Sequence, residues 1–303
     1  NMEHVGIRGI CTASGITAKT LAGKITAAYC TSDSQSILDD PAINTVLIGT
    51  RHDSHAALTI KALLAGKHVF VEKPLCLTED ELKDIRSVYE KKAPDGLHLM
   101  VGFNRRFSPH AQEAGRFFAS RVNPLVMLYR VNAGRIPADH WVQHPDIGGG
   151  RLIGEMCHFV DYMQALSASP PTSVYASRIG RHSSGITDDQ CSIVVNFADG
   201  SIGTILYTAE GSSDLPKERF EAHADGKSLV MNDFIETQTY KDGKSTVFKT
   251  AKRDKGFTEE MSRFVKSVAG GQAPVIPFEQ IDAVTRACLL AVESLRSGVA
   301  YRL

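Results

Sequence analysis

The sequence has no excess of charge of either sign, because its 34 lysines and arginines are balanced by 34 aspartates and glutamates. A neutral chain lacks the positive surface that attracts nucleic acids and anionic membranes. Hydrophobic residues make up 43% of the chain, which is typical of a globular protein and excludes a disordered or fibrous one. We therefore expect neither nucleic acid nor a membrane as a partner.

Long hydrophobic runs and a signal-peptide pattern are also missing. The longest apolar stretches are far shorter than the roughly 18 residues that suggest a membrane-spanning helix. The six cysteines are scattered along the chain, and none forms a Cys-x-x-Cys pair. This spacing indicates free thiols in a reducing compartment rather than a disulfide framework or a structural zinc site. We expect a cytoplasmic protein.

Two domains are expected, since about 150 residues per domain is usual and the chain has 303. Over residues 1–121, short β-branched runs alternate with helical patterns, which predicts right-handed βαβ crossovers and an α/β, Rossmann-type parallel sheet. The strands expected there are 5–11, 43–49, 68–72 and 97–102, and the helices begin near Ser14 and span 53–65 and 78–91.

Residues 122–303 show a different pattern, in which strands follow one another through turns such as Asp199-Gly200. This order predicts an α+β domain with a large, mostly antiparallel open sheet. The last helix is expected to pack back toward the first domain. The expected strands are 125–131, 173–179, 191–197 and 202–208, with shorter ones around residues 225 and 242, and the helices are 151–166, 258–268 and 278–297.

A glycine-rich phosphate-binding turn is missing as well. A dinucleotide-binding domain normally opens with a strand and a G-x-G-x-x-G turn. Here the first expected strand leads into the sequence Cys-Thr-Ala-Ser-Gly at residues 11–15, and Asn1 stands before Met2. We therefore expect that a first βα unit is absent and that its strand would lie at the centre of the sheet.

Lys73 follows the strand expected over 68–72 and precedes Pro74, which cannot continue a β ladder. The lysine is therefore held at the carboxyl end of a parallel strand, where open α/β sheets bind their ligands. A solvated lysine at a strand end is the alternative.

Three glycines at 148–150 precede a helix that contains Glu155, His158 and Asp161. Residues three apart on a helix are neighbours, and carboxylates beside a histidine orient its ring and raise its pKa. The spacing therefore predicts an acid/base group at His158. The alternative is an ordinary amphipathic helix with a charged, solvent-facing side.

The polar turn over residues 50–55 follows another expected strand. Such a turn can bind a ligand, and the helix that follows favours an anion at its N-terminus. Helix capping by Asp53 or Ser54 is the alternative. The histidines at 52 and 55, and those at 140 and 144, do not form a convincing ligand set, so no metal site is expected.

Together these segments resemble the Gfo/Idh/MocA family, the relatives of glucose–fructose oxidoreductase and inositol dehydrogenase. The similarity runs through nearly the whole chain in order. Residues 135–137 and 150–161 look most similar to members that are sometimes fused to an upstream zinc-alcohol-dehydrogenase-like domain. The segments that carry the resemblance are Ile48-Gly49-Thr50 with His55, Ala65-Gly66-Lys67-His68-Val69, Glu72-Lys73-Pro74, 102–109, Trp141 with Pro145 and 148–150, and His158 with Asp161.

The resemblance implies an NAD- or NADP-dependent enzyme that oxidises or reduces a sugar, a cyclitol or a related polyol. It implies a homo-oligomer that forms through the open sheet. Lys73 would bond the reacting hydroxyl and His158 would move its proton, with Glu155 as a third catalytic residue. The residues expected to bind the cofactor are Ser14, Thr50, Arg51, His55, Glu72, Lys73, Asn104 and Trp141, and those expected to bind substrate are Lys73, Arg106, His158 and Asp161.

Three departures from the family pattern leave alternatives open. Gly154 stands where an aspartate is frequent, so Glu155 is expected to orient His158 instead, and Val142 replaces an arginine. No acidic residue follows the first expected strand, so NADP is permitted beside NAD. A non-catalytic NAD(P)- or nucleotide-sugar-binding relative, and an enzyme with a net non-redox reaction, are the alternatives. Substrate choice is expected to lie in loops 135–147 and 181–187.

Overall fold

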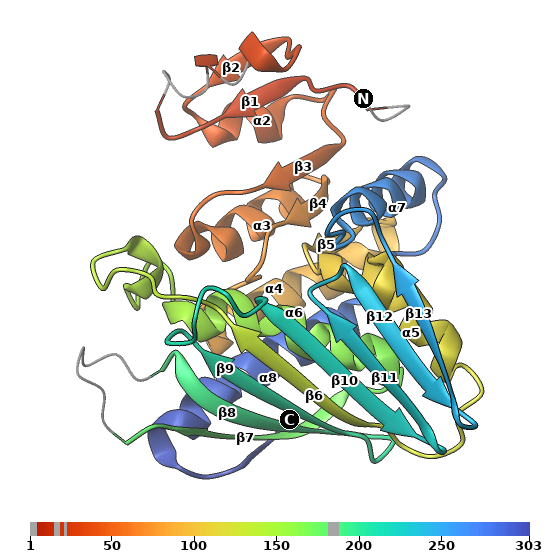
Figure 1. Cartoon of the computed structure of the whole chain (residues 1–303). Helices are drawn as coiled ribbons and strands as arrows, with labels where there is room; N and C mark the ends of the chain where they lie inside the picture. The colour runs from red at the N-terminus through yellow and green to blue at the C-terminus, as the bar shows by residue number, and fades with distance from the viewer. Residues whose placement is uncertain (1–4, 15–18, 21–22, 181–187) are drawn as a thin grey trace.

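The computed structural model describes residues 5–14, 19–20, 23–180 and 188–303 (Figure 1). Most of the helix expected to begin near Ser14 and the loop at 181–187 lie outside these residues. No helix in the described part of the chain is long and apolar enough to cross a membrane.

The first part of the chain contains parallel strands, as expected. β1 (Gly9–Cys11) pairs with β2 (Tyr29–Thr31), a strand that the sequence reading missed. β3 (Thr45–Ile48), β4 (His68–Val71) and β5 (Leu99–Val101) form a second parallel sheet in that order. Each of these three strands is a short β-branched or apolar run, which suits a strand buried between helices.

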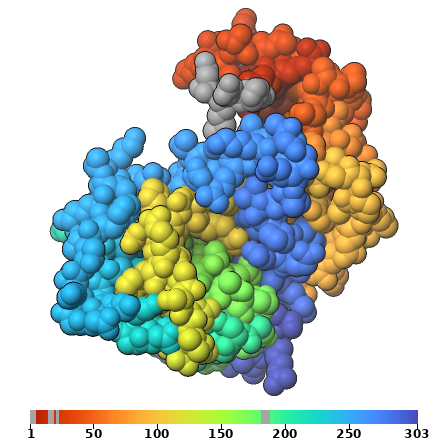
Figure 2. Space-filling model, turned by 90° about the vertical axis from the view of Figure 1, so that its right-hand side faces the viewer, coloured from red at the N-terminus to blue at the C-terminus, as the bar shows by residue number. Residues whose placement is uncertain are grey.

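The parallel strands do not form one continuous sheet. Among the described residues, no strand joins β1 to β3. In a doubly wound dinucleotide fold the strand that carries the phosphate-binding turn lies between these two positions. Leu47 of β3 is 60% exposed. Figure 2 shows the N-terminal segment, coloured red, projecting beyond the rest of the molecule.

The helices between these strands begin at local sequence signals. α4 (Glu79–Lys92) starts with a capping box, in which the Thr78 side chain accepts a hydrogen bond from the Glu81 amide and the Glu81 carboxylate accepts one from the Thr78 amide. The first turn of α4 is acidic and its last turn is basic, which complements the helix dipole. The other helices of this part are α2 (Ser34–Asp39), η1 (His52–Ser54), α3 (His55–Leu64) and η2 (Ala93–Asp95).

The second part of the chain is built on a large sheet, and its mostly antiparallel character confirms the expectation. The described strands run in the order β13-β12-β11-β10-β6-β9-β8-β7-β14, and only β6 and β9 are parallel. The strands are β6 (Val126–Asn132), β7 (Pro171–Arg178), β8 (Gln190–Phe197), β9 (Ile202–Thr208), β10 (Glu218–Ala224), β11 (Lys227–Asn232), β12 (Glu236–Lys241), β13 (Lys244–Lys249) and β14 (Tyr301–Arg302).

Helices cover one face of this sheet and leave the other face open (Figure 1). α6 (Gly150–Ser167) and α8 (Phe278–Ser297) lie against the covered face, where alternate strand residues are buried. The open face carries exposed apolar side chains, among them Val126, Leu128, Ile202 and Leu206. The remaining elements are η3 (Asn104–Phe107), α5 (Pro109–Phe118), η4 (Trp141–Gln143) and α7 (Phe257–Ala269).

The C-terminal helices contact the first part of the chain. In α8, Asp282 forms a 2.6 Å ion pair with Arg86 of α4, and the Phe278 ring stacks on Tyr89. α7 packs against β4 through the rings of Phe264 and Phe70. A single hydrophobic cluster runs through both parts, which holds their facing surfaces in a fixed arrangement. The boundary at residue 121 stays a prediction.

Candidate active site

Lys73 leaves the carboxyl end of β4 and reaches the second part of the chain. Its ammonium donates a 2.9 Å hydrogen bond to the carbonyl oxygen of Gly154, in α6. His55 supports this segment, because one of its ring nitrogens lies 2.7 Å from the carbonyl oxygen of Pro74 and the other 3.1 Å from that of Thr50. Lys73 is therefore anchored across the two halves of the molecule and is not a freely solvated strand-end lysine.

His158 lies one helical turn after Gly154 on α6, and positions four apart share a helix face. The side chain is only 6% exposed, and its Nδ1 atom has no hydrogen-bond partner within the described part of the chain. Burial, followed by the charges of Arg105, Lys73, Lys255 and Lys217, lowers the pKa of His158 well below its usual value. The expected rise in this pKa is therefore wrong, because burial disfavours the charged ring and the charges that act on it are those of cations.

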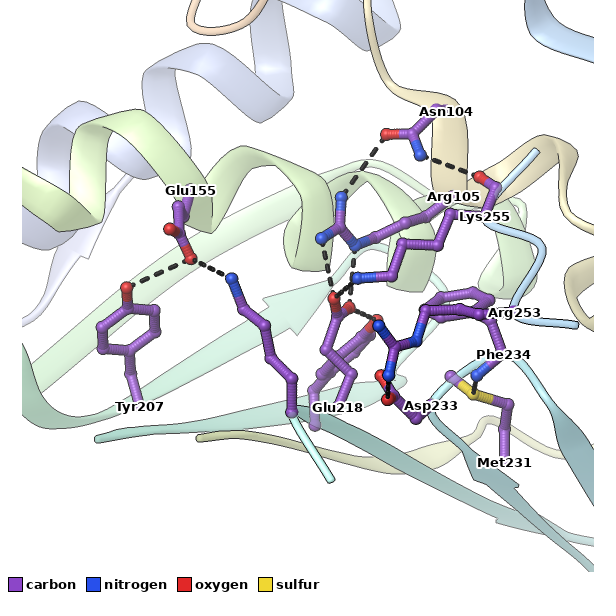
Figure 3. Close-up of polar contacts among 12 residues, drawn as sticks. Asn104, Arg105, Glu155, Tyr207, Glu218, Met231, Asp233, Phe234, Arg253 and Lys255 are labelled. Atoms are coloured by element: carbon purple, nitrogen blue, oxygen red, sulfur yellow. Dashed lines mark hydrogen bonds and ion pairs between the residues drawn. The ribbon is translucent and has the colours of Figure 1, made fainter. Parts of the chain in front are cut away.

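Glu155 makes three polar contacts. Its carboxylate accepts hydrogen bonds from the Tyr207 hydroxyl at 3.2 Å (Figure 3), from Lys217 at 3.3 Å and from Arg151 at 3.2 Å. Burial favours the neutral acid, but Lys217 and Arg151 outweigh it and lower the pKa of Glu155. Among the described residues these three are its partners and His158 is not one of them, so the structure does not support the expectation that Glu155 orients His158.

Asp161 and Arg106, which were expected to bind substrate, instead pair with each other. The Arg106 guanidinium donates to both carboxylate oxygens, at 2.9 and 2.5 Å, and also to Gln280 of α8. Burial raises the pKa of Asp161, although Arg106 acts in the opposite direction. Because both oxygens of the buried Asp161 are engaged, the pair joins η3 to α6 and α8 and offers no acceptor to a substrate.

A buried group of charges lies beside His158. Glu218 of β10 accepts two 2.8 Å hydrogen bonds from Arg105, one of 2.5 Å from Lys255 and one of 2.7 Å from the Tyr129 hydroxyl. Figure 3 shows the Glu218 carboxylate between the two cations. Burial alone would raise the pKa of Glu218, but Arg105 and Lys255 hold it far below its usual value. One carboxylate facing two cations leaves the cluster positive.

Asn104 belongs to the same buried region and not to an open cofactor surface. Its side chain is 0% exposed and donates a 2.8 Å hydrogen bond to the backbone oxygen of Lys255. Its predicted contact with the cofactor is therefore not supported. The sequence reading missed Glu218 and Lys255 as members of this region, because no local motif marks either residue.

The turn after β3 docks on the loop that precedes α6. His52 lies 2.8 Å from the Gly148 oxygen through Nδ1, and its ring packs against the edge of Trp141. The Arg51 guanidinium lies over the same indole, 5.6 Å from the ring centroid. Burial lowers the pKa of His52 to about 4, so the ring is neutral. Trp141 and Arg51, both expected at the cofactor, therefore lie together at the end of β3.

His52 also explains the glycine at position 154. A Cβ atom built on Gly154 would approach the Cε1 atom of His52 to 3.1 Å, which is tighter than ordinary van der Waals contact. An aspartate at this position would need His52 to move. Gly154, which replaces the aspartate that is frequent in the family, therefore lies against the buried His52 ring, which occupies the space that a side chain would take. Because the two residues are far apart in the sequence, no local motif predicts this contact.

The remaining expected residues lie at the ends of the parallel strands. The Glu72 carboxylate follows β4 and lies close to Gly102, where an added Cβ would come within 3.1 Å of it. Thr50 shares a 2.6 Å hydrogen bond with Ser54 at the end of β3, and Ser14 follows β1. Ser54 makes no capping bond to α3. In the described ranges no group of three His, Cys, Asp or Glu side chains could hold a metal ion.

Two family models match the chain. Residues 2–103 match the oxidoreductase family with an NAD-binding Rossmann fold, and residues 124–230 match the GFO/IDH/MocA C-terminal domain. The fold and these matches define the class of the protein: an oxidoreductase with a nicotinamide-dinucleotide-binding domain. The chain belongs to the GFO/IDH/MocA family. The comparisons give no support for a special likeness to members fused to a zinc-alcohol-dehydrogenase-like domain.

Characterised relatives cover most of the chain. It is 26% identical to D-xylose 1-dehydrogenase (NADP(+)) 2 of Haloferax volcanii over 89% of this chain and 83% of that protein. It is 23% identical to myo-inositol 2-dehydrogenase of Thermotoga maritima over 82% and 76% of the two chains. A structure of levoglucosan dehydrogenase with NADH and levoglucosan has the same fold, with a TM-score of 0.83, 24% identity and coverage of 97% and 89%.

These findings confirm the enzyme class that the sequence predicts, an oxidoreductase that uses NAD or NADP and acts on CH–OH groups. They favour this activity over the non-catalytic alternative. NAD and NADP both remain predicted cofactors, because the relatives include enzymes named for NAD(+) and enzymes named for NADP(+).

Glu260 of α7 is a buried carboxyl group that forms no ion pair with any described residue. Its Oε1 atom has no partner in the described residues, and burial followed by the charges of Glu72 and Asp161 raises its pKa to about 9. The folded state therefore keeps this group protonated, whereas the unfolded chain ionises it above about pH 4.5. Stability is consequently lost as the pH rises from about 4.5 toward about 9.

We expect Glu260→Gln to stabilise the protein at about pH 8 by an amount of the order of 2–4 kcal/mol, because the amide stays neutral. The gain should shrink toward zero as the pH falls to about 4.5. Thermal unfolding of both proteins over this pH range measures it. The exposed neighbour Glu259 provides the control, and Glu259→Gln should change little. Identical pH profiles for Glu260→Gln and the unsubstituted protein would contradict the assignment.

Proposed function

We propose that this chain transfers a hydride between a nicotinamide cofactor and a secondary alcohol of a sugar or cyclitol, with Lys73 and His158 as the catalytic pair. One observation carries the assignment of these residues. The Lys73 ammonium is bonded to the Gly154 oxygen, one helical turn before His158, whose Nδ1 atom has no partner among the described residues. A cationic donor and a neutral imidazole from opposite halves of the molecule are thus held within one turn of a single helix.

The pair has the chemistry that alcohol oxidation needs. A neutral imidazole accepts the proton of the substrate hydroxyl, and an ammonium beside the same oxygen stabilises the negative charge that develops on it. The nicotinamide, when bound, supplies the hydride acceptor. In the reverse direction the protonated His158 returns the proton to the oxygen of the ketone. The lowered pKa of His158 keeps it in the proton-accepting form at neutral pH.

The residues at the ends of β3, β4 and β5 fit the nicotinamide end of the cofactor. Ligands of open α/β sheets bind outside the carboxyl ends of the strands. We assign Thr50, Arg51, Glu72 and Trp141 to this side, whereas His55 acts by holding the Lys73 segment and the buried Asn104 has no part. Ser14, at the end of β1, is assigned to the far end of the dinucleotide.

Two finer points belong to the same proposal. The exposed apolar side chains on the open face of the large sheet support a homo-oligomer that forms through this face. Light scattering would then detect an assembly of more than one chain.

The six cysteines are all free and four are buried, which supports a reducing compartment such as the cytoplasm.

The activity is tested by incubating the purified protein with NAD or NADP and a panel of aldoses, polyols and inositols. The absorbance of the reduced nicotinamide should rise with at least one sugar or cyclitol. Bound cofactor without any reduction across the panel would support the non-catalytic alternative. Product formation without release of reduced cofactor would support a net non-redox reaction.

A further inference from the structure

A cavity of about 610 Å³ lies at the end of the large sheet, next to the first turn of α6. Its walls come from the ends of β6 and β9 and from the loop that leads into β10. Asn132 ties this loop to the sheet, because its side-chain amide donates to the backbone oxygens of Ser212 at 2.7 Å and Leu215 at 3.1 Å. Helix α6 contacts the cavity wall through Arg151, which donates a hydrogen bond to the backbone oxygen of the lining residue Gly134.

Cations outnumber anions around this cavity. Its charged lining residues are Arg135, Lys217, Arg253 and a single carboxylate, Glu210. Arg135 forms a 2.6 Å ion pair with Glu210, so these two charges compensate each other. The side chains of Lys217 and Arg253 are 35% and 53% exposed, so both can reach a ligand in the cavity. The lining therefore has a net charge of about +2 at neutral pH.

The partners of Lys217 and Arg253 lie behind the cavity wall. Lys217 bonds Glu155, which is not a lining residue. Arg253 pairs with Asp233, which directly follows β11 (Figure 3). The charge-assisted contact between Lys217 and Glu155, at 3.3 Å, is long for its type. Each cation therefore keeps donor hydrogens that its partner does not occupy.

Lys217 connects the cavity to the proposed catalytic pair. Its ammonium bonds the Glu155 carboxylate of α6, the helix that also carries His158. Lys217 is also one of the cations whose charge acts on His158, with Arg105, Lys73 and Lys255. The Lys217 side of the cavity thus lies within electrostatic range of the imidazole, and a positive field concentrates anionic ligands.

We propose that the substrate is a carbohydrate that bears an anionic group, a carboxylate or a phosphate, which binds Lys217 and Arg253 while its reacting hydroxyl lies at Lys73 and His158. This inference rests on the proposed function and names the substrate class for the same site. Lysine and arginine donate hydrogen bonds and accept none, whereas a sugar hydroxyl needs both kinds of partner. Carboxylate and phosphate oxygens only accept, so they match the lining better than a neutral sugar does.

Matched pairs of substrates test this inference. Glucuronate and glucose 6-phosphate are each compared with glucose, and galacturonate with galactose, and the two kinds of anion distinguish a carboxylate from a phosphate. We expect kcat/KM for an anionic member to exceed that of its neutral partner by about tenfold or more, which corresponds to 1.4 kcal/mol. Equal or higher values for the neutral members would overturn the inference.

A binding measurement separates this inference from the proposed function. If no pair is turned over, the same sugars are titrated into the protein with NADH by calorimetry. Heat of binding from an anionic member and not from its neutral partner would support the inference even though the proposed reaction had failed. Absence of binding by every anionic member would overturn it.

Two substitutions locate the effect in the cavity. Lys217→Met and Arg253→Met should each lower the anionic-to-neutral ratio of kcat/KM, or of binding constants, by about fivefold or more. Lys83→Met makes the same change of charge on the exposed face of α4 and should leave the ratio unchanged. If Arg253→Met fails to fold, Lys217→Met alone decides. An unchanged ratio in a folded Lys217→Met protein would overturn the role of the cavity.

Discussion

Replacing His158 by alanine is expected to lower kcat by about 10²–10⁴-fold, because the proton of the substrate hydroxyl then has no positioned acceptor. His158 is the buried imidazole whose ring nitrogen is left without a partner in the described residues, and its lowered pKa keeps it neutral. The affinity for the cofactor should change little, since no cofactor-lining residue is removed. Steady-state kinetics measures the first effect, and titration of NADH fluorescence measures the second.

Lys73→Met should lower kcat by a similar factor, because methionine keeps the length of the side chain but removes the charge beside the reacting oxygen. The two residues act on one oxygen atom, so the double variant should lose less than the product of the two single losses. Lys61→Met, on the exposed side of α3, is the matched control and should retain the activity. Turnover within about threefold of the unsubstituted protein in either single variant would remove that residue from the pair.

Local patterns were sufficient to predict the elements that position Lys73. The β-branched run that forms β3, the capping residues Thr78 and Glu81 of α4, and the proline after Lys73 each act within a few residues of the chain. Such signals determine where a strand or helix begins and ends. They also place the side chain at the carboxyl end of a parallel strand, which is where the structure has it.

The contacts that complete the site could not be predicted in this way, because they join distant parts of the chain. Arg106 and Asp161 looked like separate ligand-binding residues, but the fold brings their side chains into a single buried pair. His52 and Gly154 carry no motif individually, and only their packing shows that a larger residue at position 154 would crowd the His52 ring. A pattern of spacing within one helix contains no information on which residues of other elements will face it.

Helix α6 shows the same limit. Its sequence predicts an apolar face and a polar face, and the polar face could have been solvated. Instead α8 and the large sheet cover nearly the whole helix, and polar residues on it are buried. Arg151 and Asp161 then bond partners on other elements, whereas the Nδ1 atom of His158, like the Tyr162 hydroxyl, has no partner in the described residues. What distinguishes His158 is the Lys73 ammonium, which bonds Gly154 one helical turn before it, and only the tertiary structure shows this contact.

The largest effect on stability is expected at Glu218. Glu218→Gln should destabilise the protein by about 3–5 kcal/mol, because Arg105 and Lys255 would stay buried without a compensating charge. Glu221→Gln is the matched control, since Glu221 lies on the same strand, pairs with Arg219 and is partly exposed. That change should cost less than about 1 kcal/mol. Urea unfolding at neutral pH measures both.

The pH dependence of this effect has a definite sign. The folded-state pKa of Glu218 lies below its unfolded value, so the ionised carboxylate stabilises the fold above about pH 4.5. That contribution is lost as the pH falls from about 4.5 toward the folded-state pKa, and the difference between the two proteins should shrink over this range. A loss below about 1 kcal/mol at neutral pH would show that the two cations do not depend on Glu218.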